Sequence, residues 1–164
     1  MVKLLFSLVL FCVLSACSDD SGRLAKMEER ITALEKKADR SYTPGFGEFM
    51  GNIQLHHAKL WFAGSNSNWP LAAFEMDEIK ETIGDLKRYR AERVETKTLP
   101  MIDPALERVR AAIEKKDVNE FKKSFTVLTQ TCNQCHQAVN YAFNHVKIPD
   151  RPPVGNQVFK SEIR

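Results

Sequence analysis

Several residue types and patterns that mark common protein classes are scarce or missing in this chain of 164 residues. It has only four cysteines, seven glycines and seven prolines, and its formal net charge is only +3, with both signs interleaved. It contains no glycine-rich phosphate loop and no Gly-x-Ser-x-Gly elbow. The sequence therefore argues against nucleic-acid binding and gives no sign of nucleotide hydrolysis or of serine-hydrolase chemistry.

The most apolar run in the sequence, residues 4–14, is too short for a membrane-spanning helix, which needs about 20 apolar residues. Lys3 precedes the run and the small residues of LSAC end it, so residues 1–16 are expected to be a secretory signal peptide. The tetrapeptide LSAC also resembles a bacterial lipoprotein box. That resemblance implies that the signal is removed and that Cys17 becomes a lipid-anchored first residue. The alternative is plain secretion with Cys17 as an incidental thiol.

The resemblance also suggests a location. Ser18 follows the cysteine, at the position where an aspartate would resemble a signal for retention in the inner membrane. We therefore expect a lipid-anchored protein of the bacterial cell envelope that faces the periplasm, with the outer membrane favoured.

Residues 17–43 are predicted to be a helical spacer. Arg30 and Glu35 flank an apolar seam at positions where salt bridges between helices form. The segment 30–35 also resembles a short motif of trimeric coiled coils, so residues 23–41 are a candidate for homo-oligomerisation. The alternative is a helical spacer that packs on its own domain or frays. The seam follows heptad spacing and consists of Leu24, Met27, Ile31, Leu34 and Ala38.

Residues 44–146 are predicted to form a four-helix domain. Apolar residues at helical spacing indicate helices over about 48–64, 70–89, 103–116 and 117–143, and residues 90–102 are expected to be a polar loop. We find no strand-period segment longer than a few residues. The predicted fold class is therefore all-α, an antiparallel four-helix bundle preceded by the coiled-coil-like spacer. Residues 147–164 are expected to be an extended tail that wraps the bundle or is loosely ordered. The expected start and stop signals are Gly64, Asn68, Pro70, Asp103, Pro104, Asp117 and Glu120.

The segment TCNQCHQA, residues 131–138, carries the strongest functional signal. On a helix, Cys132, Cys135 and His136 project in the same direction. Cys-x-x-Cys-His is the attachment signature of c-type haem, in which two thiols bond the porphyrin and the imidazole binds the iron. A redox dithiol is expected near a helix N-terminus instead, and a structural zinc site would need further ligands. A chance match or a simple disulfide remains as the alternative.

A helical bundle whose last helix carries this motif resembles the cytochrome c′ class of four-helix bundles. The resemblance covers about 47–144 and is specific only in the last thirty residues or so. It implies haem c attached through Cys132 and Cys135, with His136 as the proximal iron ligand. Cytochromes c′ carry a basic residue shortly after the haem histidine, whereas residues 137–140 here are Gln-Ala-Val-Asn.

The sixth iron position is predicted to face the first helix of the bundle. If that helix runs antiparallel to the last, the level of His136 falls near His56 and His57. His57 lies closer to the centre of the apolar stripe, so it is the favoured distal ligand, with His56 as the alternative and Met50 as a weaker candidate. The alternative is that both histidines are structural polar groups or that one bonds a haem propionate.

We therefore predict that the chain is a monohaem c-type cytochrome. It is expected to transfer electrons to a periplasmic redox protein and to turn over no substrate. The first alternative is a gas-binding haem protein, for nitric oxide or carbon monoxide, with an open or displaceable distal position. A second alternative is a structural lipoprotein without haem, in which the cysteine pair forms a disulfide.

Overall fold

The computed structural model of the chain describes residues 20–38 and 44–161, and the predicted signal peptide and Cys17 lie outside these residues. The chain divides into two units, Met1–Thr43 and Pro44–Arg164. Helices make up the regular structure of the described residues, which contain no strand. The prediction of an all-α protein is confirmed. None of the described helices combines the length and apolarity that crossing a membrane requires.

The described part of the first unit is one helix over residues 20–38. Its predicted seam is exposed: Leu24, Met27, Ile31 and Leu34 are between 52% and 62% accessible to solvent. This helix is therefore apolar on a face that meets solvent.

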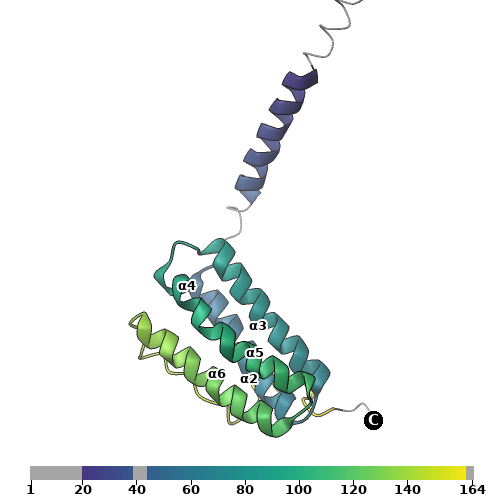
Figure 1. The fold of residues 1–164 in the computed structure, drawn as a ribbon, viewed down its shortest axis with the longest axis vertical. Helices are drawn as coiled ribbons and strands as arrows, with labels where there is room; N and C mark the ends of the chain where they lie inside the picture. Colours follow the sequence, from purple (N-terminus) through teal and green to yellow (C-terminus); the bar gives the residue numbers. More distant parts are fainter. Residues whose placement is uncertain (1–19, 39–43, 162–164) are drawn as a thin grey trace, which may run out of the picture. The chain divides into compact units, whose positions relative to one another are not determined.

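The second unit contains the remaining helices (Figure 1). α2 packs against α3 and α6, and α5 also packs against α3 and α6, so that each of these four helices has two neighbours. The elements are α2 (Phe46–Ser65), α3 (Trp69–Tyr89), α4 (Val94–Thr98), the 3-10 helix η1 (Leu99–Ile102), α5 (Asp103–Glu114) and α6 (Val118–Ala138).

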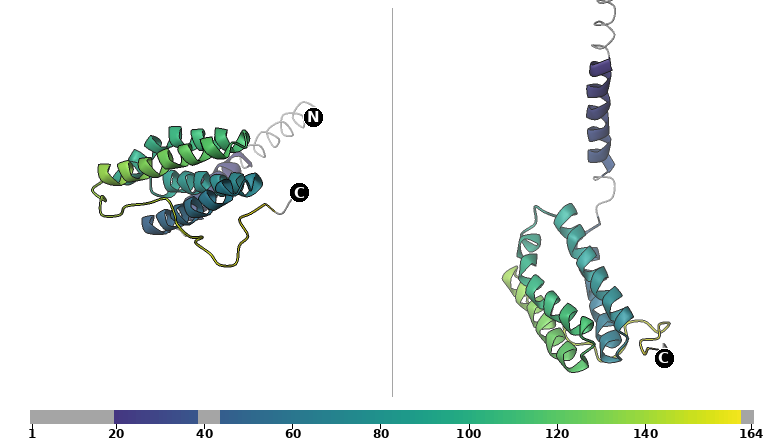
Figure 2. Two further views of the ribbon diagram at one scale, coloured as in Figure 1. Left: turned by 90° about the horizontal axis from the view of Figure 1, so that it is seen from below. Right: turned by 45° about the vertical axis from the view of Figure 1, so that its right-hand side comes forward.

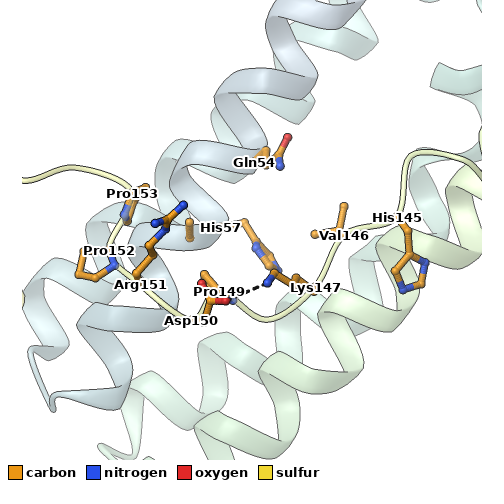
Figure 3. Close-up of a pocket in the computed structure, with 11 residues that line it drawn as sticks. Gln54, His57, His145, Val146, Lys147, Pro149, Asp150, Arg151, Pro152 and Pro153 are labelled. Carbon is orange, nitrogen blue, oxygen red and sulfur yellow. Dashed lines mark hydrogen bonds and ion pairs between the residues drawn. The ribbon is translucent and has the colours of Figure 1, made fainter.

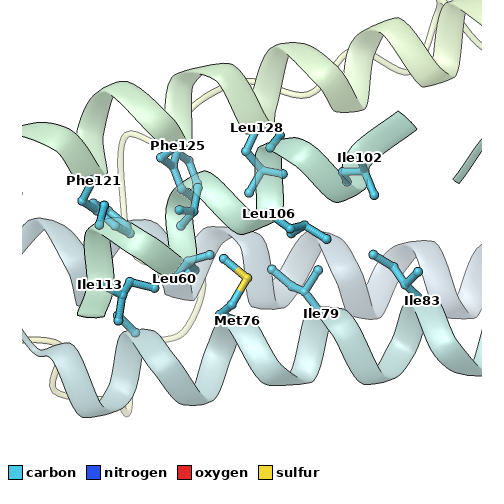
Figure 4. Close-up of a cluster of buried hydrophobic side chains, with 14 of the residues drawn as sticks. Leu60, Met76, Ile79, Ile83, Ile102, Leu106, Ile113, Phe121, Phe125 and Leu128 are labelled. Atoms are coloured by element: carbon cyan, nitrogen blue, oxygen red, sulfur yellow. The ribbon is translucent and has the colours of Figure 1, made fainter. Parts of the chain in front are cut away.

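The apolar stripes read from the sequence meet in the core (Figure 4). Phe121 and Phe125 of α6 are fully buried, and full burial of such a side chain is worth roughly 1.5–3 kcal/mol. Trp61 of α2 lies beside both phenylalanine rings, at centroid distances of 6.4 and 5.1 Å. Two of the predicted caps form: Asn68 accepts the Leu71 N–H, and Asp117 accepts two N–H groups at the start of α6.

Three helices end at a residue in the left-handed conformation, and none of the three is a glycine. Ser67 (φ 58°), Lys116 (φ 56°) and Asn140 (φ 64°) follow α2, α5 and α6. Gly64 was expected to stop the first helix, but it lies inside the last turn of α2. A Cβ there would come within 2.2–2.5 Å of the Phe121 ring, so Gly64 is needed for the close approach of α2 to α6.

The prediction of a polar loop over residues 90–102 is wrong, because this segment forms α4 and η1. Leu99 and Ile102 of η1 are buried and η1 packs against α6, so tertiary burial stabilises a helical turn that the local sequence does not favour. η1 runs directly into α5, and Asp103 therefore makes no capping hydrogen bond.

After α6 the chain has no regular structure through residue 161. It passes along the outside of the helices (Figure 2). Phe159 is buried and its ring lies 5.7 Å from that of Phe62 in α2, and Ile148 and Val154 also pack against the core. Parts of the tail therefore pack against the helices of the second unit.

Candidate functional site

A cavity of about 570 Å³ lies among α2, the α4–η1 segment and the C-terminal part of α6. Its volume falls within the range of about 300–1,000 Å³ that is common for small-molecule and cofactor sites. Most of its wall is apolar. The residues that line it are Phe46, Gly47, Met50, Gly51, Ile53, Gln54, His57, Ile83, Arg93, Glu95, Leu99, Ile102, Cys132, Cys135, His136, Val139, Tyr141, Asn144 and Val146.

The two cysteines of the motif lie on this wall as half-buried free thiols. Cys135 Sγ lies 3.1 Å from Thr98 Oγ1. The Thr98 hydroxyl donates to the Glu95 carbonyl oxygen at 2.7 Å, so the Cys135 S–H is the donor to Thr98. Burial, with a smaller contribution from Cys135, raises the pKa of Cys132 to about 12. Cys132 is therefore a neutral thiol at neutral pH.

His136 is held through one of its two ring nitrogens. Its Nδ1 lies 2.6 Å from the backbone carbonyl oxygen of Asn144. A carbonyl oxygen only accepts, so Nδ1 carries a proton, and in the neutral ring Nε2 has the lone pair. Such a bond fixes both the tautomer and the ring orientation of a ligating histidine.

The way in which α6 ends explains how the Asn144 carbonyl comes close to the His136 ring. The N–H groups of Asn140 and Tyr141 donate to Gln137 O at 3.2 Å and to His136 O at 2.7 Å. With Asn140 at positive φ, this is a Schellman motif, which turns the chain back along the helix. We expected α6 to continue about seven residues past His136. That expectation is wrong, since α6 ends at Ala138.

Asn133, between the two cysteines, fastens the returning chain to α6. Its Nδ2 donates to the Val146 carbonyl oxygen at 2.8 Å, and its Oδ1 accepts the Val146 N–H at 2.8 Å. This role of Asn133 could not be predicted from the sequence, because no local pattern links an asparagine to a backbone 13 residues away.

His57 lies on the cavity wall, and one of its two ring nitrogens is hydrogen-bonded to α6. Its Nε2 lies 2.9 Å from Thr129 Oγ1, and Thr129 itself donates to the Phe125 carbonyl oxygen at 3.0 Å. Nε2 is therefore the donor to Thr129, and Nδ1 keeps the lone pair. Burial lowers the pKa of His57 to about 4, so the ring is neutral at neutral pH. Thr129 lies seven residues before His136, about 10 Å along the helix, so His57 is not directly level with His136.

His56 and Met50 are placed differently. His56 turns toward α3, where its Nδ1 lies 2.6 Å from the fully buried carboxylate of Glu75. Lys59 Nζ lies 3.8 Å from the other oxygen of that carboxylate. His56 does not line the cavity, whereas Met50 does. Of the three distal candidates, the structure therefore brings His57 and Met50 to the same cavity as the motif.

An ion pair on the cavity wall was also missed. Arg93 donates from Nε and Nη2 to the two carboxylate oxygens of Glu95, at 3.1 and 2.5 Å. The hydrogen bond from Arg93 lowers the pKa of Glu95 below its ordinary value. The apolar residues Leu99 and Ile102, which bury the segment, are the signal that could have shown that this region is not a loop.

A second cavity, of about 720 Å³, lies between α2 and the tail (Figure 3). Gln54, His57 and Val146 line both cavities. Lys147 and Arg151 also line the second cavity, and Lys147 forms an ion pair with Asp150 at 2.9 Å. His57 is therefore part of the wall between a mostly apolar space and a more polar one.

Neither protein-family models, nor curated proteins, nor solved structures give a match to this chain. Among residues 20–38 and 44–161, no group of three or more His, Cys, Asp or Glu side chains is arranged to hold a metal ion by itself. The chemistry that the described cavity offers to a ligand is two thiols one helical turn apart, one oriented imidazole nitrogen and an apolar wall.

Proposed function

We propose that this protein is a monohaem c-type cytochrome that transfers single electrons in the bacterial cell envelope. In this proposal, haem c is attached through thioether bonds to Cys132 and Cys135, and His136 is the proximal iron ligand. The observation that carries the proposal is that all three residues line one cavity and that Asn144 holds the proton of His136 on Nδ1. Nε2 is therefore the nitrogen that is ready to bind iron.

The residues present suit a covalently attached porphyrin. Its flat macrocycle needs a largely apolar space, and the cavity wall between α2 and α6 provides one. Its two vinyl groups need two thiols at the edge of that space, and Cys132 and Cys135 are free thiols one helical turn apart. When bound, haem supplies a one-electron redox couple at its iron.

The chain's own residues then have separate tasks. The two cysteines fix the porphyrin edge against α6, while the Asn144 carbonyl keeps the His136 ring in one orientation and makes it more basic. Asn133 holds the returning chain, and with it the loop that contains Asn144, against the helix. On the opposite wall, His57 is a neutral imidazole, the form that a metal requires, and we propose it as the distal ligand.

We propose further that the helices of the second unit form an antiparallel four-helix bundle like that of cytochromes c′. This is supported by the ring of neighbours α2–α3–α5–α6, in which each helix packs against two others. The proposed location is the periplasmic face of the outer membrane, with an acyl anchor on Cys17 and a protein redox partner. The support is the apolar run 4–14 and the LSAC tetrapeptide.

A second function is supported by the bond from His57 Nε2 to Thr129. If that bond persists when haem is attached, His57 does not reach the iron through Nε2, and the sixth position is open to a small gas such as nitric oxide or carbon monoxide. Met50 and Ile53 on the same wall would make that position apolar. The protein would then be a gas-binding haem protein.

The test is to produce the full chain in a bacterium that makes c-type cytochromes and to measure its mass and absorption spectrum under denaturing conditions. We expect the mass to rise by one haem and the haem absorption to remain with the denatured chain. The variant Cys132→Ala/Cys135→Ala should lose both. Gln134→Ala, an exposed position between the two cysteines, is the matched control and should retain both.

A wild-type chain that is exported and processed but stays colourless at its haem-free mass would refute the proposal. A mass lower by two hydrogens, restored on reduction, would instead identify a disulfide between Cys132 and Cys135.

A further inference from the structure

The helix over residues 20–38 has a regular apolar stripe and a regular pattern of charges beside that stripe. A helix that stays alone in solvent needs neither. Its large apolar side chains Leu24, Met27, Ile31 and Leu34 follow one another at spacings of three, four and three residues, and all are more than half exposed. In heptad terms, Leu24 and Ile31 occupy position a, and Met27 and Leu34 occupy position d. The stripe is therefore an exposed apolar seam along one face of this helix.

The charges beside the seam are sorted by sign. The g positions are 23, 30 and 37, which hold Arg, Arg and Lys. The e positions that follow Leu24 and Ile31 are 28 and 35, and both hold Glu. Each flank of the seam thus carries a single sign of charge.

This sorting decides what can cover the seam. In a parallel pair of helices, a g residue faces the e residue five positions later on its neighbour. Arg23 would then face Glu28 of a second copy, and Arg30 would face Glu35. In an antiparallel pair, g faces g and e faces e, which would bring arginines together and glutamates together. The charges therefore favour the parallel arrangement and oppose the antiparallel one.

We infer that residues 20–38 bind a second copy of this chain as a parallel, in-register coiled coil. The two copies bury their a and d side chains against each other, and opposite charges line both edges of the contact. This inference goes beyond the proposed electron transfer and does not depend on haem. The proposed anchor at Cys17, one heptad before Leu24, would hold every copy by the same end, as a parallel arrangement requires.

Orientation and register can be tested with single cysteines in the full-length, membrane-extracted protein. In a parallel in-register pair, position 27 of one helix lies against position 27 of the next. Met27→Cys should therefore form a disulfide-linked dimer under mild oxidation, and Leu34→Cys should do the same. Lys26→Cys, on the outer face, is the control for random collision. If both seam cysteines cross-link no better than Lys26→Cys, the inference is wrong.

The charge pattern can be tested by exchange. Arg23→Glu/Arg30→Glu places glutamates opposite Glu28 and Glu35 of the second copy and should weaken self-association by at least about tenfold, as measured by sedimentation. Adding Glu28→Arg/Glu35→Arg restores opposite signs and should restore the association. An unchanged affinity in the acidic variant, or a wild-type chain that sediments as a monomer, would overturn the inference. An unaltered absorption spectrum in every variant would show that the second unit is intact.

Discussion

The Nδ1–H of His136 donates to the carbonyl oxygen of Asn144, which lies eight residues later in the chain, at 2.6 Å. The contact exists because α6 stops two residues after His136 and the chain reverses through Asn140. The helix that carries the imidazole and the loop that orients it are therefore one continuous segment. Such a local device fixes the tautomer of a metal-binding histidine without a partner from another helix.

If the chain carries the proposed haem, replacing His57 tests whether this residue is the sixth iron ligand. If His57 binds the iron, His57→Leu should convert a low-spin absorption spectrum into a high-spin one that shifts when carbon monoxide is added. Met50→Leu should then leave the low-spin spectrum in place, and so should His56→Gln, whose side chain faces Glu75. A low-spin spectrum that survives His57→Leu would exclude His57 as the ligand. A wild-type spectrum that is already high-spin would favour the gas-binding function.

Asn133→Ala should detach the chain around Val146 from α6. Two hydrogen bonds of 2.8 Å are lost, and the expected cost is about 1–3 kcal/mol of the free energy of unfolding. Hydrogen exchange at the Val146 amide should become faster by a corresponding factor. Asn133→Asp keeps the acceptor for that amide and should lose less protection, while exposed Gln134→Ala should change neither quantity. Unaltered exchange at Val146 in Asn133→Ala would show that the two hydrogen bonds of Asn133 do not hold the loop against α6.

Gly64→Ala should destabilise the second unit. The new methyl group would overlap the buried Phe121 ring at 2.2–2.5 Å, and overpacking of this kind costs about 1–3 kcal/mol. Gly84→Ala in α3 is the matched control, because nothing lies within 4 Å of its Cβ position. The control should gain about 0.5–1 kcal/mol from the higher helix propensity of alanine. Urea unfolding of both variants measures the contrast, and equal effects would contradict the close contact.

The Arg93–Glu95 pair should make stability depend on pH in the acid range. The hydrogen bond from Arg93 lowers the pKa of Glu95 in the folded state below the ordinary value of 4.5. The unfolded state therefore binds more protons in this range, and the stabilisation is complete above pH 4.5 and is lost as the pH falls through the folded-state pKa. Thermal unfolding between pH 3 and 6 should show that the advantage of wild type over Glu95→Gln shrinks as the pH falls. Exposed Glu92→Gln is the control, and a constant advantage would refute this account.

Some of the site could be predicted from residue order alone. The spacing of Cys132, Cys135 and His136 on one helix is a local property, because residues three and four apart share a face of any α-helix. The apolar stripes of α3 and α6 and the caps Asn68 and Asp117 were predicted for the same reason. Local periodicity and capping chemistry act over a few residues, so the sequence displays them directly.

The features that only the tertiary structure decided involve partners far apart in the sequence. From the sequence, the neighbours His56 and His57 are almost equally good candidates for the distal ligand. In the structure, His56 contacts Glu75 of α3, whereas His57 contacts Thr129 of α6 and lines the cavity. The two histidines have different contacts because adjacent residues on a helix point about 100° apart. The packing of the helices fixes which helix lies in each direction. The helical turns of α4 and η1 likewise depend on burial of Leu99 and Ile102. The sequence by itself determined the all-α class of the described residues and the placement of two thiols and an imidazole on one face of a helix. The packing of the helices decided which residues lie around that face.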